Sequence, residues 1–523
     1  MNATRSRAKR LLRLFGIVLA ALLVLVASGL LLADRLTPKA LGSASHTLPL
    51  QPAQTRIDRE LQPLLAAHPG QSGVAYLSDG LDAYAARAVI TRYAGRSLDL
   101  QYYIWHDDLV GHLLARDLYE AAERGVRVRL LLDDMNAKGL DPMLVALDAH
   151  PNIELRLYNP FRNRGGLWRS LEMVQRAFSV NHRMHNKAWI ADGRMAIVGG
   201  RNIGEEYFDA RPDVNFRDLD LLLAGPVVAQ ASGIFDDYWN SDAAVPITAL
   251  NRHSAPLQTL LRKAEPEWLL QRARPYLQRV RDQAQARYLE DHIPLHWTAH
   301  VEVRSDPPLK HRQADRSDWL VTRLVRELTG TRHKALLISP YFVPGKSGTW
   351  AMTQMVADGR QVGVITNSLA ANDVAAVHGG YMRYRTSLLR GGVQLYELKA
   401  HGGHGKSTLF GSSGASLHTK AFVIDDQRGF VGSFNLDPRS AYLNTEMGVL
   451  FDDPTLAAQL RDEYLRLASP ALAYRVYLDP RGRVRWLDRG TQPPRSYSVE
   501  PETSFMQRAL ARGISWLPLE SQL

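Results

Sequence analysis

The pattern of apolar and polar positions predicts alternating strands and helices over most of the chain. Ser97–Trp105 has the composition of a strand, Leu113–Gly125 has a helical apolar period that stops at a glycine, and Val126–Asp133 again has the composition of a strand. Units of this kind favour a sheet with parallel neighbouring strands covered by helices. The same succession recurs further along the chain, in Lys334–Phe342, Met352–Gly359 and Gln361–Asn367.

Two independent landmarks indicate that this recurrence is an internal repeat. The glycines that end the two helices, Gly125 and Gly359, are 234 residues apart. Two histidines in a shared motif, His185 and His418, are 233 residues apart. Nearly equal offsets in unrelated features predict a duplicated α/β domain.

One segment has the length and composition of a membrane anchor. Leu14–Ala33 is a run of 20 residues without a charge, and five Arg or Lys residues precede it. A cleaved signal peptide is the alternative, but its apolar stretch is usually only 7–15 residues. The basic flank predicts a cytoplasmic N-terminus, with the rest of the chain outside the cytoplasm.

The remaining segments follow from composition shifts and turn signals. Ser504–Leu517 is expected to be a helix that either packs on the domain or lies on the membrane. Between the two halves lies an Arg-rich helical stretch, which we interpret as a solvated linker rather than a lipid-contacting helix. The predicted organisation is a basic flank (1–13), an anchor (14–33), a tether (34–73), a first α/β domain (74–250), a helical linker (251–294), a second α/β domain (295–469) and a C-terminal hairpin and helix (470–523).

The amino-acid composition excludes several kinds of catalytic and metal site and indicates the charge of the partner. The 523 residues contain no cysteine, which excludes disulfide scaffolds, cysteine-ligated metals and thiol catalysis. The formal net charge of +11 favours an anionic partner, either nucleic acid or anionic lipid. Five of those charges precede the uncharged run, so part of the excess is a topology signal.

A single motif, H-x-K-x4-D-x6-G-[GS]-x-N, occurs once in each half of the repeat. In a strand, the His and the Lys two residues later point to the same face and can enter one site. Two full copies at the offset of an independent repeat exclude a chance match. The fixed positions are His185, Lys187, Asp192 and Asn202 in the first copy, and His418, Lys420, Asp425 and Asn435 in the second.

These residue types suit phosphoryl transfer. One neutral histidine can attack phosphorus, while the other protonates the leaving alkoxide and later deprotonates the acceptor. Lysine and asparagine side chains can hold the non-bridging oxygens, so no metal or other cofactor is expected. A second candidate, a metal site at His106-Asp107-Asp108 with His112, lacks ligand spacing, and a loop before a capped helix explains it better.

The paired motifs resemble the phospholipase D superfamily over about Val74 to Ser469. The resemblance implies two similar α/β/α domains that form one active site at their interface, and the predicted N-terminal transmembrane helix is an additional element of the chain. It implies that Asp192 and Asp425 support the fold, and it favours His185 as the nucleophile. It implies a catalytic set of His185, Lys187, Asn202, His418, Lys420 and Asn435.

Each histidine also requires a carboxylate that fixes its tautomer. By the same resemblance an acidic residue on a later strand does this. Glu446 fits in the second half. In the first half Asp218 is the better candidate and Asp220 the alternative.

Further stretches are similar to bacterial cardiolipin synthases, among them Ser339–Gly345, Arg385–Leu398, Asn435–Ser440 and Gly200–Phe208. The resemblance implies transfer of a phosphatidyl group from a second phospholipid to phosphatidylglycerol, in the bacterial inner membrane. An accessory protein is compatible with it. The single anchor, the long C-terminal extension and Gly200, where serine is common, depart from the usual pattern.

Three other functions use the same residues. They are hydrolytic phospholipase D activity, nuclease activity and non-catalytic binding of phosphate or lipid. Nucleic acid is the less favoured partner, because the catalytic half lacks runs of Lys and Arg interleaved with aromatic residues.

Overall fold

The structure, a computed structural model, describes most of the chain from residue 41 onwards. Among the described residues no helix is both long enough and apolar enough to cross a bilayer. Most of the predicted anchor, Leu14–Ala33, lies outside the described residues. The described residues are 14, 16–18, 21, 28, 41–176, 181–211, 215–251, 267–285, 294–372, 374–400 and 417–517.

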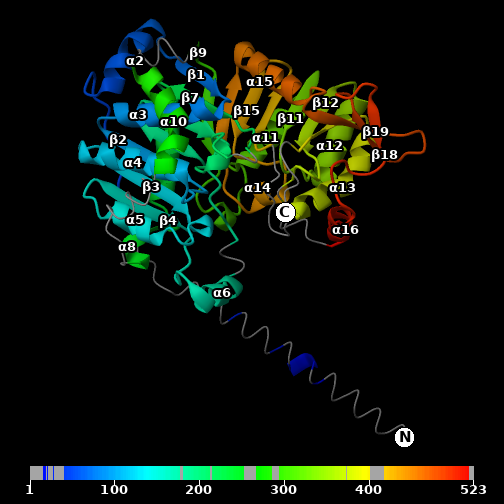
Figure 1. Cartoon of the computed structure of the whole chain (residues 1–523), viewed down its shortest axis with the longest axis horizontal. Helices are drawn as coiled ribbons and strands as arrows, with labels where there is room; N and C mark the ends of the chain where they lie inside the picture. The colour runs from blue at the N-terminus through cyan, green and yellow to red at the C-terminus, as the bar shows by residue number, and fades with distance from the viewer. Residues whose placement is uncertain are drawn as a thin grey trace.

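Two mixed sheets lie side by side, each with helices packed against it (Figure 1). The first sheet has the strand order β8-β4-β3-β2-β5-β6-β7-β1-β9. Its strands are β1 (Ser72–Leu77), β2 (Ser97–Tyr102), β3 (Arg127–Asp133), β4 (Ile153–Tyr158), β5 (Ala188–Ala191), β6 (Met195–Gly199), β7 (Asp220–Ala224), β8 (Ala244–Pro246) and β9 (His296–Thr298).

The second sheet has the order β10-β16-β15-β14-β11-β12-β13-β17-β18-β19. Its strands are β10 (Val301–Ser305), β11 (Lys334–Ile338), β12 (Gln361–Asn367), β13 (Gln394–Leu398), β14 (Lys420–Ile424), β15 (Arg428–Gly432), β16 (Met447–Asp452), β17 (Ala473–Leu478), β18 (Val484–Asp488) and β19 (Arg495–Tyr497).

The helices complete each half. In the first half they are α2 (Arg56–Ala67), α3 (Gly80–Tyr93), α4 (Leu109–Glu123), α5 (Asp141–Asp148), α6 (Gly166–Gln175), α7 (Val228–Trp239), α8 (Ile247–Leu250) and α10 (Glu267–Gln285), with the short 3-10 turns η1 (Asp134–Asn136) and η2 (Glu205–Tyr207). In the second half they are α11 (Leu320–Thr329), α12 (Gly345–Ala357), α13 (Ala375–Arg390), α14 (Pro438–Tyr442), α15 (Pro454–Leu467) and α16 (Phe505–Ile514), with the turn η4 (Lys310–Arg312).

The topology confirms the predicted duplication. Strands β2, β3 and β4 are parallel neighbours, as are β11, β12 and β13. In each sheet the motif strand, β5 or β14, pairs antiparallel with the first of these three strands. The order β4-β3-β2-β5-β6-β7 in one sheet therefore repeats as β13-β12-β11-β14-β15-β16 in the other. The expected pair of similar α/β domains with parallel neighbouring strands is confirmed.

Helix starts and stops follow local chemistry. Asp108 caps α4 by accepting a hydrogen bond from the Gly111 N–H, so the capped-helix interpretation of this loop is confirmed. The chain leaves α4 through Gly125, whose φ of 89° is readily adopted only without a side chain. Gly359 has a φ of 87° after α12, so the two repeat landmarks occupy equivalent turns.

The segments around the two halves pack closely on them. Backbone carbonyls of Ser43 and Ser45, in the segment interpreted as a tether, accept hydrogen bonds from Arg156 and Arg129 of the first sheet. Strand β9, at the start of the range predicted for the second domain, pairs with β1 in the first sheet. Strands β17 to β19, in the C-terminal extension, continue the second sheet.

Helix α10 is not a purely solvated linker. Ala273, Tyr276 and Val280 recur at helical spacing and are buried. The Tyr276 ring meets Tyr84 of α3 edge-on, at a centroid distance of 5.0 Å, and its hydroxyl donates to the Phe208 carbonyl. This helix therefore covers α3 of the first domain.

A shared core joins the two sheets. It combines residues of the first half, such as Ala188 and Leu221, with residues of the second half, such as Ala421 and Val449. Each half also has a core of its own. The strands that follow the two motifs therefore belong to one packed unit, which holds the two motifs in fixed relative positions.

Candidate active site

The two motifs meet where the two sheets join. Lys187 directly precedes β5 and Lys420 is the first residue of β14, and each histidine lies two residues before its lysine. Each histidine is only 8% exposed, and both lysines are buried. Lys187 and Lys420 each act electrostatically on both histidines, which places all four side chains at one centre.

Backbone hydrogen bonds fix each motif against the opposite half. The His185 N–H donates to the Thr445 carbonyl of the second half at 2.8 Å. The His418 N–H donates to the Arg217 carbonyl of the first half, also at 2.8 Å. Thr445 and Arg217 directly precede the two candidate carboxylates, so these bonds bring each carboxylate to the histidine of the other half.

The histidine–carboxylate pairs therefore cross between the halves. His185 Nδ1 lies 2.8 Å from Glu446 Oε2. His418 Nδ1 lies 2.5 Å from Asp218 Oδ2. Because Nδ1 is engaged in both rings, Nε2 is the nitrogen that each ring offers for chemistry.

The alternative carboxylate in the first half, Asp220, has a different environment. It is fully buried and lies 2.8 Å from the Arg87 guanidinium and 3.3 Å from that of Arg201. The geometry therefore supports Asp218 as the partner of His418, with Asp220 neutralising two buried arginines.

Glu446 and Asp218 have different neighbours, and this difference explains why the first motif has Gly200 where the second has Ser433. The Ser433 and Ser440 hydroxyls donate to the two oxygens of Glu446 at 2.5 and 2.7 Å. Gly200 occupies the position of Ser433 in the first motif. A Cβ at position 200 would lie 2.2 Å from Asp218 Oδ1. The position of the Asp218 carboxylate therefore leaves no room for a serine side chain at position 200.

Burial and neighbouring charges shift the pKa values of the two histidines and of their carboxylate partners in different directions. Burial, reinforced by Lys187 and Lys420, lowers the pKa of His185 well below its ordinary value. Burial and Lys420 lower the pKa of His418 to about 4, partly opposed by Asp218. Burial alone would raise the pKa of Asp218, but His418 and Lys420 hold it below its usual range. Burial raises the pKa of Glu446 to about 7.

The lysine side chains of the motifs contact the histidine backbone, and the asparagine side chains are buried. The Nζ atoms of Lys187 and Lys420 donate to the carbonyls of His185 and His418. Burial lowers the pKa of Lys187 to about 7. Asn202 accepts from the Ile104 N–H and donates to the Tyr207 hydroxyl. Asn435 Oδ1 is buried without a hydrogen-bond partner among the described residues.

Asp192 and Asp425 lie at the far ends of the motif strands. Asp192 accepts hydrogen bonds from the backbone N–H groups of Gly95, Arg96 and Ser97, where β2 begins. Asp425 accepts equivalent bonds from residues 332, 333 and 334, where β11 begins. These bonds tie each motif strand to its neighbour and place neither carboxylate at the histidines.

Aromatic rings beside the histidines were not apparent from the motifs. Tyr103 meets His185 edge-on at 5.0 Å, and Lys187 Nζ lies 5.5 Å from the centre of the same ring. Phe216 stacks on His418 at 5.3 Å, and Tyr207 meets His418 edge-on at 5.2 Å. Tyr103 lies in the predicted strand Ser97–Trp105, and Tyr207 lies in the family-like stretch Gly200–Phe208, whereas Phe216 had no signal in the sequence.

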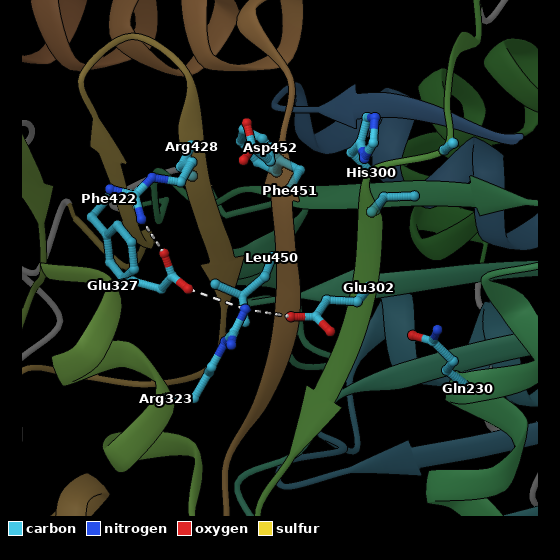
Figure 2. A pocket seen from close by; sticks show the side chains of 13 residues that line it. Gln230, His300, Glu302, Arg323, Glu327, Phe422, Arg428, Leu450, Phe451 and Asp452 are labelled. Carbon is cyan, nitrogen blue, oxygen red and sulfur yellow. Dashed lines mark hydrogen bonds and ion pairs between the residues drawn. The ribbon is translucent and has the colours of Figure 1, made fainter. Parts of the chain in front are cut away.

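Two other features lie outside this centre. His106, Asp108 and Glu206 place three potential ligand atoms within 4.8 Å of one another, but Asp108 already accepts two backbone N–H groups. A cavity of about 390 Å³ lies beside β10 and β16, and none of the six motif residues that we assign to catalysis lines it (Figure 2). Its charged residues already pair with one another, Arg323 with Glu302 and Glu327.

Comparison with known proteins agrees with this geometry. Residues 90–239 and 324–468 match the family described as cardiolipin synthase, PLD-like domain. The chain is 42% identical to cardiolipin synthase C of Escherichia coli over 482 residues, which cover 89% of this chain and 99% of that protein. It is 24% identical to cardiolipin synthase A of Pseudomonas syringae, over 74% of this chain and 66% of that protein.

A solved structure shares the fold. The phosphatidylserine synthase of Haemophilus influenzae aligns with a TM-score of 0.53 and 14% identity, over 79% of this chain and 91% of that one. Two duplicated α/β domains with paired histidine motifs define an enzyme of the phospholipase D superfamily, of the phosphatidyltransferase type. Within that superfamily, the chain belongs to the cardiolipin synthase family.

Proposed function

We propose that the protein makes cardiolipin by transferring a phosphatidyl group from one phospholipid to phosphatidylglycerol through a phosphohistidine intermediate. The crossed pairs of histidine and carboxylate carry this proposal. They supply two rings that each offer Nε2 at one centre, beside two lysines. The 42% identity to a cardiolipin synthase over nearly its full length supports the choice of substrate.

The proposed reaction has two balanced steps. In the first, His185 Nε2 attacks phosphorus, the bond from phosphorus to the headgroup oxygen breaks, and His418 gives its proton to the departing alkoxide. In the second, His418 takes the proton of a phosphatidylglycerol hydroxyl, whose oxygen attacks phosphorus and releases His185. One phosphodiester replaces another, so no nucleotide is consumed.

The opposite pKa shifts of Glu446 and Asp218 support His185 as the nucleophile. A nucleophile must be neutral, and His185 is the ring whose pKa is held well below its ordinary value, beside a carboxyl whose pKa is raised. A general acid must carry a proton, and His418 is the better candidate because Asp218, which its surroundings keep ionised, partly opposes the lowering of the His418 pKa.

The remaining residues have roles in binding and support. Lys187, Lys420, Asn202 and Asn435 hold the non-bridging phosphate oxygens through their side-chain N–H groups. The uncharged run Leu14–Ala33 anchors the chain in the bacterial inner membrane as a single pass, with the catalytic domains outside the cytoplasm.

A product assay tests the proposed function. Detergent-solubilised protein is incubated with phosphatidylglycerol labelled in its glycerol headgroup, alone and together with a second phospholipid. We expect cardiolipin and free glycerol, and we expect EDTA to leave the rate unchanged because lysine and asparagine side chains hold the phosphate. Phosphatidic acid as the sole lipid product would make the enzyme a hydrolase, and neither product would contradict both functions.

The pH dependence should show the loss of the Lys187 charge. A buried lysine with a pKa of about 7 is cationic below that pH and neutral above it. We therefore expect kcat/KM to fall as the pH rises through about 7. In Lys187→Arg the charge persists at all accessible pH values, so this decline should disappear although the overall rate is lower. A decline that survives in the arginine variant would assign it to another group.

A further inference from the structure

The solvent-facing side of α16 carries an apolar stripe. Phe505, Met506 and Trp516 are 77%, 72% and 80% exposed, and Leu517 extends the stripe in the turn that follows the helix. Ala509 and Arg512 are exposed at helical spacing between Phe505 and Trp516, which follows the end of the helix, so this side combines exposed apolar residues with one cation. A surface helix normally faces solvent with polar residues, so this side of α16 has the composition of a covered surface.

The opposite side of α16 already packs on the protein. Ala511 and Ile514 are buried, and Gly379 of α13 lies so close that a Cβ there would meet the Ala511 carbonyl at 2.9 Å. The sequence left open whether this helix packs on the domain or lies on a membrane. Its packing on α13 is therefore confirmed, and the exposed stripe has no partner among the described residues.

Helix α6 presents a second apolar patch, made of Leu167, Trp168 and Met173. Leu167 and Trp168 are 73% and 70% exposed. Between them and the core, Arg169 is buried against the Phe161 ring, so the helix is fixed in orientation. This helix belongs to the connection between β4 and the first motif, and therefore lies near the edge of the sheet from which His185 enters the active site.

The two patches lie at one edge of the molecule. In Figure 1, α6 and α16 both lie at the lower edge, on either side of α14, whereas α15 lies at the opposite edge. Helix α14 begins three residues after Asn435 of the second motif. In this view, α6 and α16 therefore lie on the same side of the molecule as α14, the helix that follows the second motif.

We propose that the α16 stripe and the α6 patch dock on the surface of an anionic phospholipid bilayer and turn the active site toward it. This inference rests on the proposed function, because two lipid headgroups must reach the histidines while their acyl chains stay in the membrane. Tryptophan and phenylalanine are well suited to the interface between headgroups and acyl chains.

The charges of the two helices agree with an anionic partner. Helix α16 contains Arg508 and Arg512 and no acidic residue. The one carboxylate of α6, Glu172, is occupied by the backbone N–H groups of Arg162 and Asn163. A basic helix with exposed aromatic residues is attracted to anionic lipid and inserts its rings shallowly.

Because the chain contains no cysteine, single cysteines can report the depth of each position. Spin labels are placed at Trp168→Cys, Phe505→Cys and, as a matched control, Leu465→Cys on α15, which is 56% exposed. The full chain is reconstituted in vesicles of phosphatidylglycerol and phosphatidylcholine. Collision with oxygen, which partitions into lipid, is compared with collision with a water-soluble nickel chelate.

We expect the labels at 168 and 505 to collide at least about threefold more with oxygen relative to the chelate than the label at 465 does. Equal ratios at all three positions would overturn the proposal. Protection of 168 and 505 from both reagents would also overturn it, because it would mean that protein covers the patches. The label readout needs no turnover, so it fails or succeeds independently of the product assay.

Discussion

A His418→Ala variant given a phosphatidyl ester of p-nitrophenol is expected to release one equivalent of nitrophenolate rapidly and then to stall. Nitrophenolate is a good leaving group and needs no proton, so His185 can still attack phosphorus. The second step requires a base to activate the acceptor alcohol, and we expect steady-state turnover to fall by about 10³–10⁴-fold. The burst is measured by stopped-flow absorbance, and the trapped phosphatidyl group by mass spectrometry of His185.

His185→Ala is expected to lose both the burst and the steady-state rate, because no phosphohistidine can form. A burst in His185→Ala and none in His418→Ala would reverse the two roles, and no burst in either variant would contradict a covalent path through one histidine. His46→Ala is the matched control, because the His46 side chain is 72% exposed and lies outside the site. Thermal unfolding of all three variants shows whether a lost burst reflects lost chemistry or lost folding.

Much of this site was accessible from the sequence because its determinants are local. The spacing of His185 and Lys187 recurs at His418 and Lys420, and this recurrence shows the duplication, although both histidines lie just before their strands and not within them. The parallel strands and the connecting helices were likewise predicted from apolar periodicity and from glycines at the helix ends. Their boundaries shifted by a few residues, as at β2, which ends at Tyr102 instead of Trp105.

The crossed carboxylates could not be predicted in this way. His185 and Glu446 are separated by 261 residues, and their contact depends on the register in which the two sheets meet. That register is set by the shared core and by the backbone bonds to Thr445 and Arg217, none of which has a local pattern. The packing of α10 on α3 was missed for a related reason. Its buried positions are few, and polar residues, mostly arginine and glutamine, dominate its composition.

The pairing of each histidine with a carboxylate of the other half predicts large and different effects for changes at the two carboxylates. If Asp218 orients His418, Asp218→Asn should impair the same kinetic step as His418→Ala, because His418 is the general acid and base. With the nitrophenyl ester it should keep a fast burst, and its turnover should fall by about 10²–10⁴-fold. Glu446→Gln should instead slow the burst itself, because it removes the carboxylate that orients the nucleophile.

Carboxylates that served the histidine of their own half would give the opposite pattern, with the burst lost in Asp218→Asn and retained in Glu446→Gln. Combining Asp218→Asn with His418→Ala should cost little beyond His418→Ala alone, because both changes disable one unit. Asp220→Asn is the matched control in the same strand region. It leaves Arg87 and Arg201 short of a buried counter-charge, so it should lower the melting temperature, while folded protein retains a normal burst. A burst that fails in Asp220→Asn at temperatures where the protein is folded would instead place that carboxylate in the chemistry and contradict the assignment of Asp218.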